Sequence, residues 1–419
     1  MSIQKPFLYF IPGIIAWLIR PVFLIMLILP LLAEGQIIKE DTIRSLTIED
    51  AVSLALDNNI EIKNTALERK KTEYNKGSSI QIKPIRAEYR RGQINSYLND
   101  QWLEVYQNFG SPLESYYNRK KAEHEINAKE KELKLTKLEI EKETKLVYFN
   151  WIYLYNKKKI IQQQLEKYKE LARVVDIREK MGESDRLSKF MAQSQFHKAK
   201  TELKKIRNQT SIAENQLKLL LNTRHHLIPK SDTLRLYEIR QPQPQTNDLV
   251  NPTLQDLYEE KININNYEIK AQKARYLPEI TAGYFRQEIN QTGGFNGWML
   301  GISVPLWYQS KKAAVQKAKV NKAIAENNLV HKKNKQQTTV KNLVHELNSY
   351  KEDIIYFHES ALNEFEELLS IAQEQYEKEE ITYDNYIDLL KKAYEIKTQY
   401  LETVKNYNQT AVKLEFYVN

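Results

Sequence analysis

The distribution of proline and glycine most constrains how this chain can fold. Between Pro112 and Pro229 the sequence contains no proline and only one glycine, Gly182, and after Pro305 it contains neither residue through Asn419. An interior proline costs a helix about 3 kcal/mol and an interior glycine about 1 kcal/mol. Stretches of this length that avoid both residues predict long helices.

Each stretch has room for a hairpin of two helices. A helix over 113–177 would be on the order of 100 Å long, more than the diameter of a compact domain. Apolar residues of the last helix have the spacing of a coiled-coil seam: Leu389, Ala393, Ile396, Tyr400, Val404, Tyr407, Ala411, Leu414 and Val418. The earlier stretch carries two stripes: Leu135, Leu138, Leu146, Phe149 and Tyr153, and Leu133, Ile140, Val147, Trp151 and Leu154. Two stripes predict neighbours on two sides.

The two halves of the chain resemble each other, which predicts an internal duplication. Three residues recur at an offset of 197: Leu146, Val147 and Tyr153 match Leu343, Val344 and Tyr350. Farther on, "REKMGESD" matches "YEKEEITYD" at an offset of 198. Two pairs have capping-box spacing, which predicts helix starts: Thr47 with Asp50 and Thr253 with Asp256. The predicted division is a first repeat at 36–228, a linker at 229–252 and a second repeat at 253–419.

The N-terminal segment 1–35 has the pattern of a signal peptide. Lys5 and Arg20 precede an apolar run, and Ala33 and Gly35 supply the small residues of a cleavage site. An uncleaved inner-membrane anchor remains an alternative, because the apolar material is long. No later segment is apolar enough for a transmembrane helix, so a mature chain that crosses a membrane would need strands.

Alternation typical of strands precedes each helical stretch. Trp298, Leu300, Ile302 and Val304 alternate with small or polar residues, which predicts a membrane-facing strand surface. In the first half, Ile85, Ala87 and Tyr89 alternate with Arg86, Glu88 and Arg90, and Leu103, Val105 and Phe109 oppose Trp102, Glu104, Tyr106 and Asn108. A soluble two-stranded hairpin in each repeat would show the same alternation. Aromatic residues near the strand ends favour the membrane interpretation: Trp102, Tyr106, Trp298 and Trp307.

Four strands per chain cannot close a sheet in lipid, where an unpaired amide costs several kcal/mol. A chain of this kind would have to oligomerise in order to insert. Three copies would supply twelve strands and twelve long helices, enough for a barrel continued by a helical tube. The predicted fold class is therefore mainly α, with duplicated helical hairpins and a small membrane β part.

From about 46 to 418 the sequence resembles outer-membrane efflux proteins of the TolC type. The likeness rests on the duplicated opening helices, the paired "SPL" and "VPL" segments, and the hairpin returns "MGESDRLSKF" and "EEITYDNYIDLL". It implies a homotrimer in outer-membrane lipid, a tunnel into the periplasm, and a periplasmic adaptor docked at the hairpin tips. Those tips would comprise Met181, Gly182, Glu183, Ser184 and Asp185, and Glu380, Ile381, Thr382 and Tyr383. Glu380 stands where such proteins usually have a turn glycine.

The C-terminal segment 381–418 is most similar to members that serve inner-membrane pumps of the resistance-nodulation-division (RND) class for heavy metals. This resemblance implies heavy-metal cations as possible cargo. Asp384 and Asp388 would lie on one side of a helix, where threefold symmetry could make an acidic aperture. The alternative is an ordinary helix start that acidic residues stabilise.

Composition and motifs give little support to other functions. The formal net charge is +9, but 63 basic and 54 acidic residues are interleaved, which is typical of solvated helices rather than of nucleic-acid binding. Cysteine is absent, and no Walker, GxSxG or HExxH motif occurs, so we expect no enzyme activity and no cofactor. His225, His226 and the other histidines are expected to be ordinary solvated side chains. An inner-membrane-anchored coiled-coil scaffold and an efflux adaptor remain rival functions.

Overall fold

A computed structural model describes residues 43–78, 83–230, 233–238, 251–290, 292–304 and 308–418. The chain divides into two compact units, Met1–Ile43 and Arg44–Asn419, and the second contains all the helices described below. The predicted signal peptide, most of the predicted linker and Trp307 lie outside the described residues.

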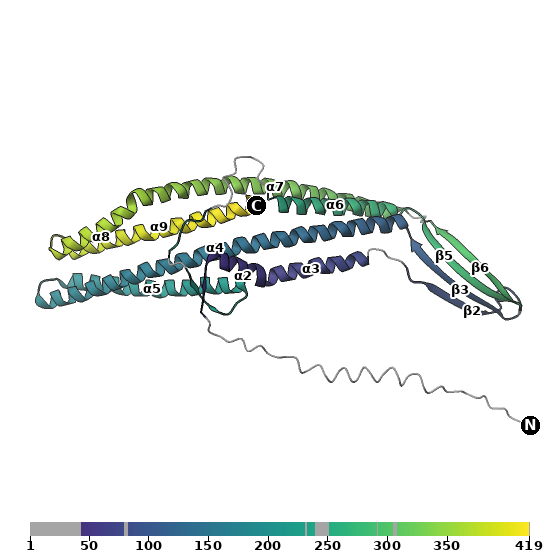
Figure 1. Cartoon of the computed structure of the whole chain (residues 1–419), viewed down its shortest axis with the longest axis horizontal. Coiled ribbons are helices and arrows are strands. Elements are labelled where there is room, and N and C mark those ends of the chain that lie inside the picture. The colour runs from purple at the N-terminus through teal and green to yellow at the C-terminus, as the bar shows by residue number, and fades with distance from the viewer. Residues whose placement is uncertain are drawn as a thin grey trace, which may run out of the picture. The chain divides into compact units, whose positions relative to one another are not determined.

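Each half of the second unit contains a pair of strands followed by a long helical hairpin (Figure 1). The elements of the first half are β1 (Ile43–Leu46), α2 (Ile48–Asn58), α3 (Ile60–Gly77), β2 (Arg86–Gly92), β3 (Asp100–Gly110), α4 (Pro112–Met181), α5 (Arg186–Leu221) and β4 (His226–Pro229). Those of the second half are α6 (Pro252–Ala274), β5 (Glu279–Ile289), β6 (Thr292–Ser303), α7 (Gln309–Tyr356), η2 (Phe357–Ala361), α8 (Leu362–Glu377) and α9 (Tyr383–Val418). The prediction of a mainly helical chain with duplicated hairpins is confirmed.

The hairpins begin and end where the sequence supplies caps. α4 has 70 residues and is therefore about 105 Å long. Ser111 caps its first turn, and Pro112 follows at a position where a missing N–H leaves no helical hydrogen bond unmade. α5 and α9, the returning helices of the two hairpins, have 36 residues each.

The helices lie side by side in rows (Figure 1). α7 packs against α6 and α9, both of these pack against α4, and α4 packs against α3 and α5. The four-stranded sheet has the order β2-β3-β5-β6. The helices that adjoin these strands in the chain are, in the same order, α3, α4, α6 and α7. The order of the strands in the sheet therefore matches the order of the helices in the rows. One edge of the unit is formed by α3, α5 and β2, and the other by α7 and β6.

The main core lies where α2, α4, α5 and α9 meet. Trp151, Leu217 and Val404 are each no more than 1% exposed there. Both predicted stripes of α4 contribute buried residues, including Phe149 and Trp151, and α4 has neighbours on two sides as predicted. A second cluster around Tyr168 and Leu390 packs the two hairpins together nearer their tips.

A buried ionic cluster joins α4, α9 and the described connector residues 233–238. The Lys145 Nζ atom lies 2.7 Å from Glu141 and 2.9 Å from Glu415, and it donates to the Tyr237 hydroxyl at 3.0 Å. Tyr237 in turn donates to Glu415 at 2.6 Å. Burial alone would lower the pKa of the Lys145 amine, but these hydrogen bonds hold that pKa above its ordinary range.

Two predicted local features differ from the structure. Thr47 and Asp50 do form a capping box, but Asn251, not Thr253, caps α6 by accepting from the Leu254 N–H at 3.1 Å. Pro252 occupies the first turn of α6 and therefore moves the helix start ahead of the matched threonine. The second long helix is also not uniformly α: the π-helical turn η2 separates α7 from α8, and the ribbon changes direction there (Figure 1).

Candidate functional site

The four-stranded sheet has one apolar face. Its antiparallel register places Ala87, Val105, Tyr284 and Trp298 in one row across all four strands. Residues two positions away along each strand share this face: Tyr89, Leu103, Ala282, Arg286 and Leu300, with Ile280 and Ile302 following. Apart from Arg286, Asn296 and Gln107, the face is apolar over most of its extent.

The predicted membrane-facing residues lie on this apolar face and its continuation. Trp298, Leu300, Ile302 and Val304 are 85, 84, 74 and 51% exposed. A contiguous apolar surface of this kind on a folded chain indicates contact with lipid or with another protein.

The opposite sheet face mixes charged, small and aromatic residues. Arg90 pairs with Glu88 at 2.9 Å, and Trp102 stacks on Phe285 with ring centroids 5.3 Å apart. Gly297 permits this packing, because a Cβ atom there would lie 2.8 Å from the Phe285 ring. The two faces therefore suit different environments.

Asp100 ties together the two strand turns at the far end of the sheet. Its carboxylate accepts from the backbone N–H groups of Asn95, Ser96 and Asn290 at 2.6, 2.7 and 2.9 Å. Asp100 is 1% exposed. The sequence analysis missed this residue, and only its position among turn-forming Asn and Ser residues signalled it.

The edges of the sheet are unpaired within the described chain. β2 pairs only with β3, and β6 pairs only with β5. Each edge strand therefore presents one row of backbone N–H and C=O groups that a further strand can satisfy.

The two hairpin tips have the same backbone turn. At the first, Gly182 has φ 80°, and the N–H groups of Gly182 and Glu183 donate to the carbonyls of Glu179 and Arg178. At the second, Glu379 has φ 59°, and the same pair of bonds runs from 379 and 380 to 376 and 375. The left-handed residue is therefore Glu379, not Glu380, and the tip offset is 197, not 198. The Glu-Lys pairs at 179–180 and 377–378 recur at an offset of 198, one residue away from the structural offset of the turns.

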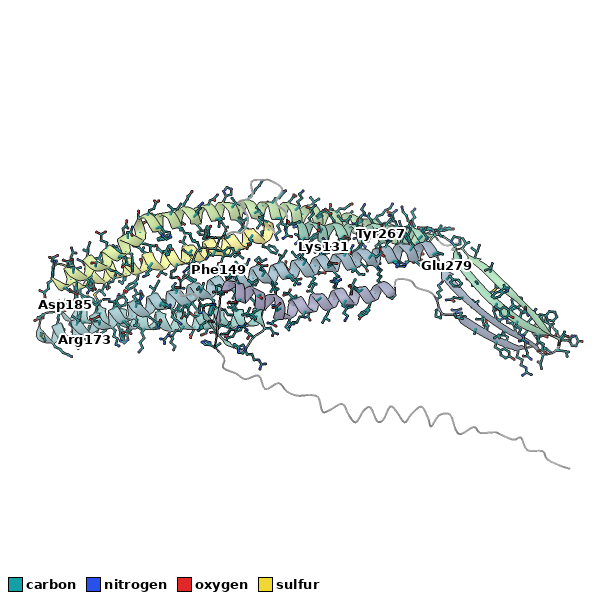
Figure 2. The ribbon with its side chains drawn as sticks, in the orientation of Figure 1. Lys131, Phe149, Arg173, Asp185, Tyr267 and Glu279 are labelled. Carbon is teal, nitrogen blue, oxygen red and sulfur yellow. The ribbon has the colours of Figure 1, made fainter. Side chains whose placement is uncertain are left out.

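The first tip presents apolar side chains beside the predicted docking residues. Met181 and Leu187 are both 67% exposed, and Phe190 is 56% exposed. Gly182 and Glu183 are also exposed, while Ser184 is half-buried. Asp185 caps α5 by accepting from the Ser188 N–H at 2.8 Å. Figure 2 shows Asp185 and Arg173 at the hairpin end and Glu279 at the opposite end, where the sheet begins.

A charge cluster fixes the stem of the first tip. Lys189 of α5 lies 2.7 Å from Asp176 and 3.2 Å from Glu179, both on α4. Hydrogen bonds from Lys180 and Lys189 lower the pKa of Asp176 to about 2. These contacts hold the two helices of the hairpin in register.

Aromatic packing joins the second tip to the first hairpin. Tyr376 stacks on Tyr386 with centroids 4.6 Å apart, and the Arg178 guanidinium lies 5.6 Å from the Tyr376 ring. Arg178 also pairs with Glu379 at 3.5 Å. Burial raises the pKa of Tyr386 to about 12 and also raises that of Tyr383, so both phenols stay neutral at physiological pH.

The remaining predicted residues of the second tip flank this cluster. Thr382 begins α9 by accepting from the Asn385 N–H at 3.4 Å, and Ile381 packs against the buried tyrosines. Asp384 and Asp388 follow on the exposed side of α9. Asp388 pairs with Lys391 at 3.2 Å.

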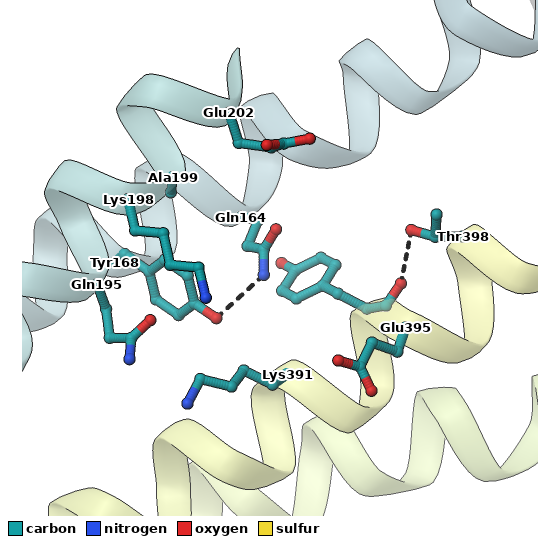
Figure 3. Close-up of a pocket in the computed structure, with 10 residues that line it drawn as sticks. Gln164, Tyr168, Gln195, Lys198, Ala199, Glu202, Lys391, Glu395 and Thr398 are labelled. Carbon is teal, nitrogen blue, oxygen red and sulfur yellow. Dashed lines mark hydrogen bonds between the residues drawn. The ribbon is translucent and has the colours of Figure 1, made fainter. Parts of the chain in front are cut away.

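A cavity of about 260 Å³ lies between α4, α5 and α9 (Figure 3). The Gln164 amide donates to the Tyr168 hydroxyl at 3.0 Å on one wall, and the Thr398 hydroxyl donates to the Tyr394 carbonyl at 2.8 Å on another. Its charged lining is balanced: Lys198, Lys391, Glu202 and Glu395. This balance gives the cavity no preference for an ion of either sign.

Among the described residues, no group of three or more His, Asp or Glu side chains is arranged to hold a metal ion. The His226 ring lies 2.8 Å from Glu214, and His225 is half-buried. Within the described part of the chain, no helix combines the length and the apolar composition that crossing a bilayer requires.

The fold is that of bacterial outer-membrane channel structures. A membrane protein from Pseudomonas aeruginosa superposes with a TM-score of 0.77 at 15% identity, over 89% of this chain and 93% of that one. CusC, described as forming a transmembrane channel, gives 0.76 at 16% identity over 89% and 92%. The CmeC outer membrane channel of Campylobacter jejuni gives 0.76 at 16% identity over 88% and 85%. The descriptions of CusC and CmeC name channels, and this chain shares their fold.

A sequence-family model supports the same class. Residues 112–223, which contain α4, the first tip and α5, match the model for outer membrane efflux proteins. Comparison with curated protein sequences finds no match. The efflux-channel resemblance is thus supported by one matched hairpin and by the fold of nearly the whole chain.

Proposed function

We propose that this chain is the subunit of a trimeric exit duct in the outer membrane, which passively conducts substrates of a tripartite efflux system. One observation carries the proposal: the long helix rows are continued by a sheet with one exposed apolar face. The apolar face suits lipid contact, and the face that carries Arg86, Glu88, Arg90 and Glu104 suits a wet lumen.

The open edges support closure by further copies. The edge formed by α7 and β6 would meet the edge formed by α3, α5 and β2 of the next copy, a head-to-tail contact that closes as a ring. Three copies would give a twelve-stranded barrel, whose strands leave no amide unpaired in lipid. The helices would extend about 100 Å from it into the periplasm.

The tips are the proposed contact with a periplasmic adaptor. The exposed apolar group formed by Met181, Leu187 and Phe190 suits a docking surface better than a solvated turn does. An inner-membrane pump of the RND class would supply the energy. The proposal that heavy-metal cations are the cargo is supported only by the sequence resemblance of 381–418. The proposal of an acidic aperture is supported by the exposed positions of Asp384 and Asp388.

The proposed chain organisation follows the sequence prediction. A signal peptide at 1–35 would direct export, the repeats would span 36–228 and 253–419, and the linker at 229–252 would join them. His225 and His226 have no proposed role in conduction.

Membrane fractionation, native mass determination and planar-bilayer conductance test the duct. We expect an outer-membrane trimer that forms discrete pores. A monomer confined to the inner membrane, without conductance, would instead support the anchored coiled-coil scaffold. A soluble or lipid-independent species that binds a pump directly would support the adaptor.

A further inference from the structure

The net positive charge of the chain is concentrated on one helix. Residues 309–345 contain nine lysines and one glutamate, whereas the formal net charge of the whole chain is only +9. All 37 positions belong to α7, on the strand side of the second hairpin. A bias of this size on one edge helix is unlike the interleaved charges elsewhere in the sequence.

Seven of these lysines form no ion pair with any residue that the structure describes: Lys312, Lys317, Lys319, Lys332, Lys333, Lys335 and Lys341. Glu326, the only acidic residue of the segment, is engaged by Lys322 at 3.3 Å. The other lysine, Lys311, donates to the Arg275 carbonyl. The seven therefore keep their full charge toward solvent.

Acidic side chains of the packed neighbours are committed elsewhere. On α6, three acidic residues pair with α4: Asp256 with Lys131, Glu260 with His124 and Glu268 with Lys121, at 2.6, 2.6 and 3.0 Å. Glu259 of α6 accepts from Gln255. On the adjoining part of α9, Glu402 pairs with Lys405 and Glu415 with Lys145. None of these carboxylates neutralises the lysines of α7.

The lysines occupy two flanks of α7. Val315, Ala318, Val340 and Leu343 mark the buried stripe toward α6 and α9. Around the helix axis, at about 100° per residue, the lysines fall into two groups. Each group is centred about 90° from the buried stripe, one group on each side of it. The first flank has Lys312, Lys319, Lys333 and Lys341, and the second has Lys317, Lys332 and Lys335.

Opposite the buried stripe, residues 309–345 of α7 are uncharged. This free edge includes Val320, Ile324, Asn327, His331 and Thr338, and Val320 and Ile324 are 59 and 52% exposed. In a closed ring this edge would meet the next copy, so one lysine flank must face the lumen and the other the exterior. Whichever flank faces inward, α7 brings three or four lysines per copy to the wall.

We propose that the strand-side half of the duct prefers anions, so that the cargo class it favours is acidic organic solutes rather than free metal cations. The inference rests on the proposed duct function and adds its charge selectivity. Nine or twelve unpaired ammonium groups around one lumen would create a positive potential inside a low-dielectric wall. A potential of one kT changes the ratio of anions to cations by about sevenfold.

The test compares two sets of variants by reversal potential in asymmetric KCl. One set combines K312Q, K319Q, K333Q and K341Q, and the other combines K317Q, K332Q and K335Q. Each flank serves as the matched control for the other, since both sets alter solvent-facing lysines of the same helix. We expect one set to lower the chloride-to-potassium permeability ratio on the order of threefold to tenfold, and the other to leave it unchanged.

The outcomes separate this inference from the duct itself. The shift should shrink between 0.05 M and 1 M salt, because screening shortens the reach of the lysines to about 3 Å. A conducting trimer whose permeability ratio neither set changes, either alone or combined with Asp388→Asn, would overturn the anion preference and leave the duct intact. A wild-type protein that never conducts would overturn both.

Discussion

Replacing Lys145 with methionine should destabilise the protein by about 3 kcal/mol. Lys145 and Glu415 have side chains only 7 and 5% exposed, so the substitution strands a carboxylate in the core. Removal of one partner from a buried pair costs about 3–5 kcal/mol. The lower end applies because Glu415 keeps its 2.6 Å bond from Tyr237, while Glu141, whose side chain is 30% exposed, can return to water.

Two further variants show that the cost comes from the stranded charge. Lys142→Met, one turn earlier on α4, removes only an ammonium group 4.0 Å from the Phe416 ring and should cost about 0.5–1 kcal/mol. The double variant Lys145→Met with Glu415→Leu removes both charges and should recover most of the loss. The expected coupling energy between positions 145 and 415 is about 2 kcal/mol.

Urea unfolding of the detergent-solubilised protein, followed by helical circular dichroism, measures these differences as midpoint shifts at constant slope. Because the pKa of Lys145 is raised in the folded state, its contribution is present below the ordinary lysine pKa and is lost at strongly alkaline pH. If Lys145→Met proved no more costly than Lys142→Met, or no less stable than the double variant, the reasoning about the buried cluster would be wrong.

Three predictions concern the tips. Glu379→Gly should stabilise the second tip by about 0.5–1 kcal/mol, because Glu379 has φ 59°, a backbone conformation that glycine adopts more readily. The control Glu380→Gly should give no such gain. Equal urea-unfolding midpoints for the two variants would contradict this prediction. Because the pKa of Asp176 is lowered to about 2, its carboxylate should stabilise the folded protein fully above pH 3.8 and lose that contribution as pH falls toward 2. An acid-unfolding curve that Asp176→Asn leaves unchanged would contradict this prediction. Asp388→Asn should change single-channel conductance or cation preference if the aperture exists, and unchanged values would remove that role.

The helices could be predicted from the sequence because their signals are local. Avoidance of proline and glycine set their extent, and the threes-and-fours spacing in α9 matched residues that are buried, such as Val404 and Leu414. The turn η2 has no comparable signal, since a π-helical turn uses the same residues as an α-helix. The α6 start was wrong because Asn251 and Pro252 outweigh a threonine two residues later.

The site was less accessible to sequence reasoning because it depends on register and burial. Alternation identified the apolar residues of β6, but only the pairing places Trp298 beside Tyr284 and Val105 on one face. Lys145 lies in a run of charged residues, and nothing in the neighbouring sequence distinguishes it from lysines that are exposed. Its burial follows from the distant connector and α9, which pack against it.

The two proposed selectivity elements carry opposite charge and act in series. Residues 309–345 are basic, whereas 346–388 contain thirteen acidic residues and two lysines, so the second hairpin reverses sign near the end of α7. Fixed charge influences an ion only within a few Debye lengths, about 8 Å at physiological salt, so each region controls its own part of the tube. The narrower region dominates the measured permeability ratio. Consequently, a closed acidic aperture would mask the lysines of α7. Combining Asp388→Asn with the lumen-facing lysine set should then enlarge the shift that this set alone produces, whereas the combination with the other set should show only the effect of Asp388→Asn.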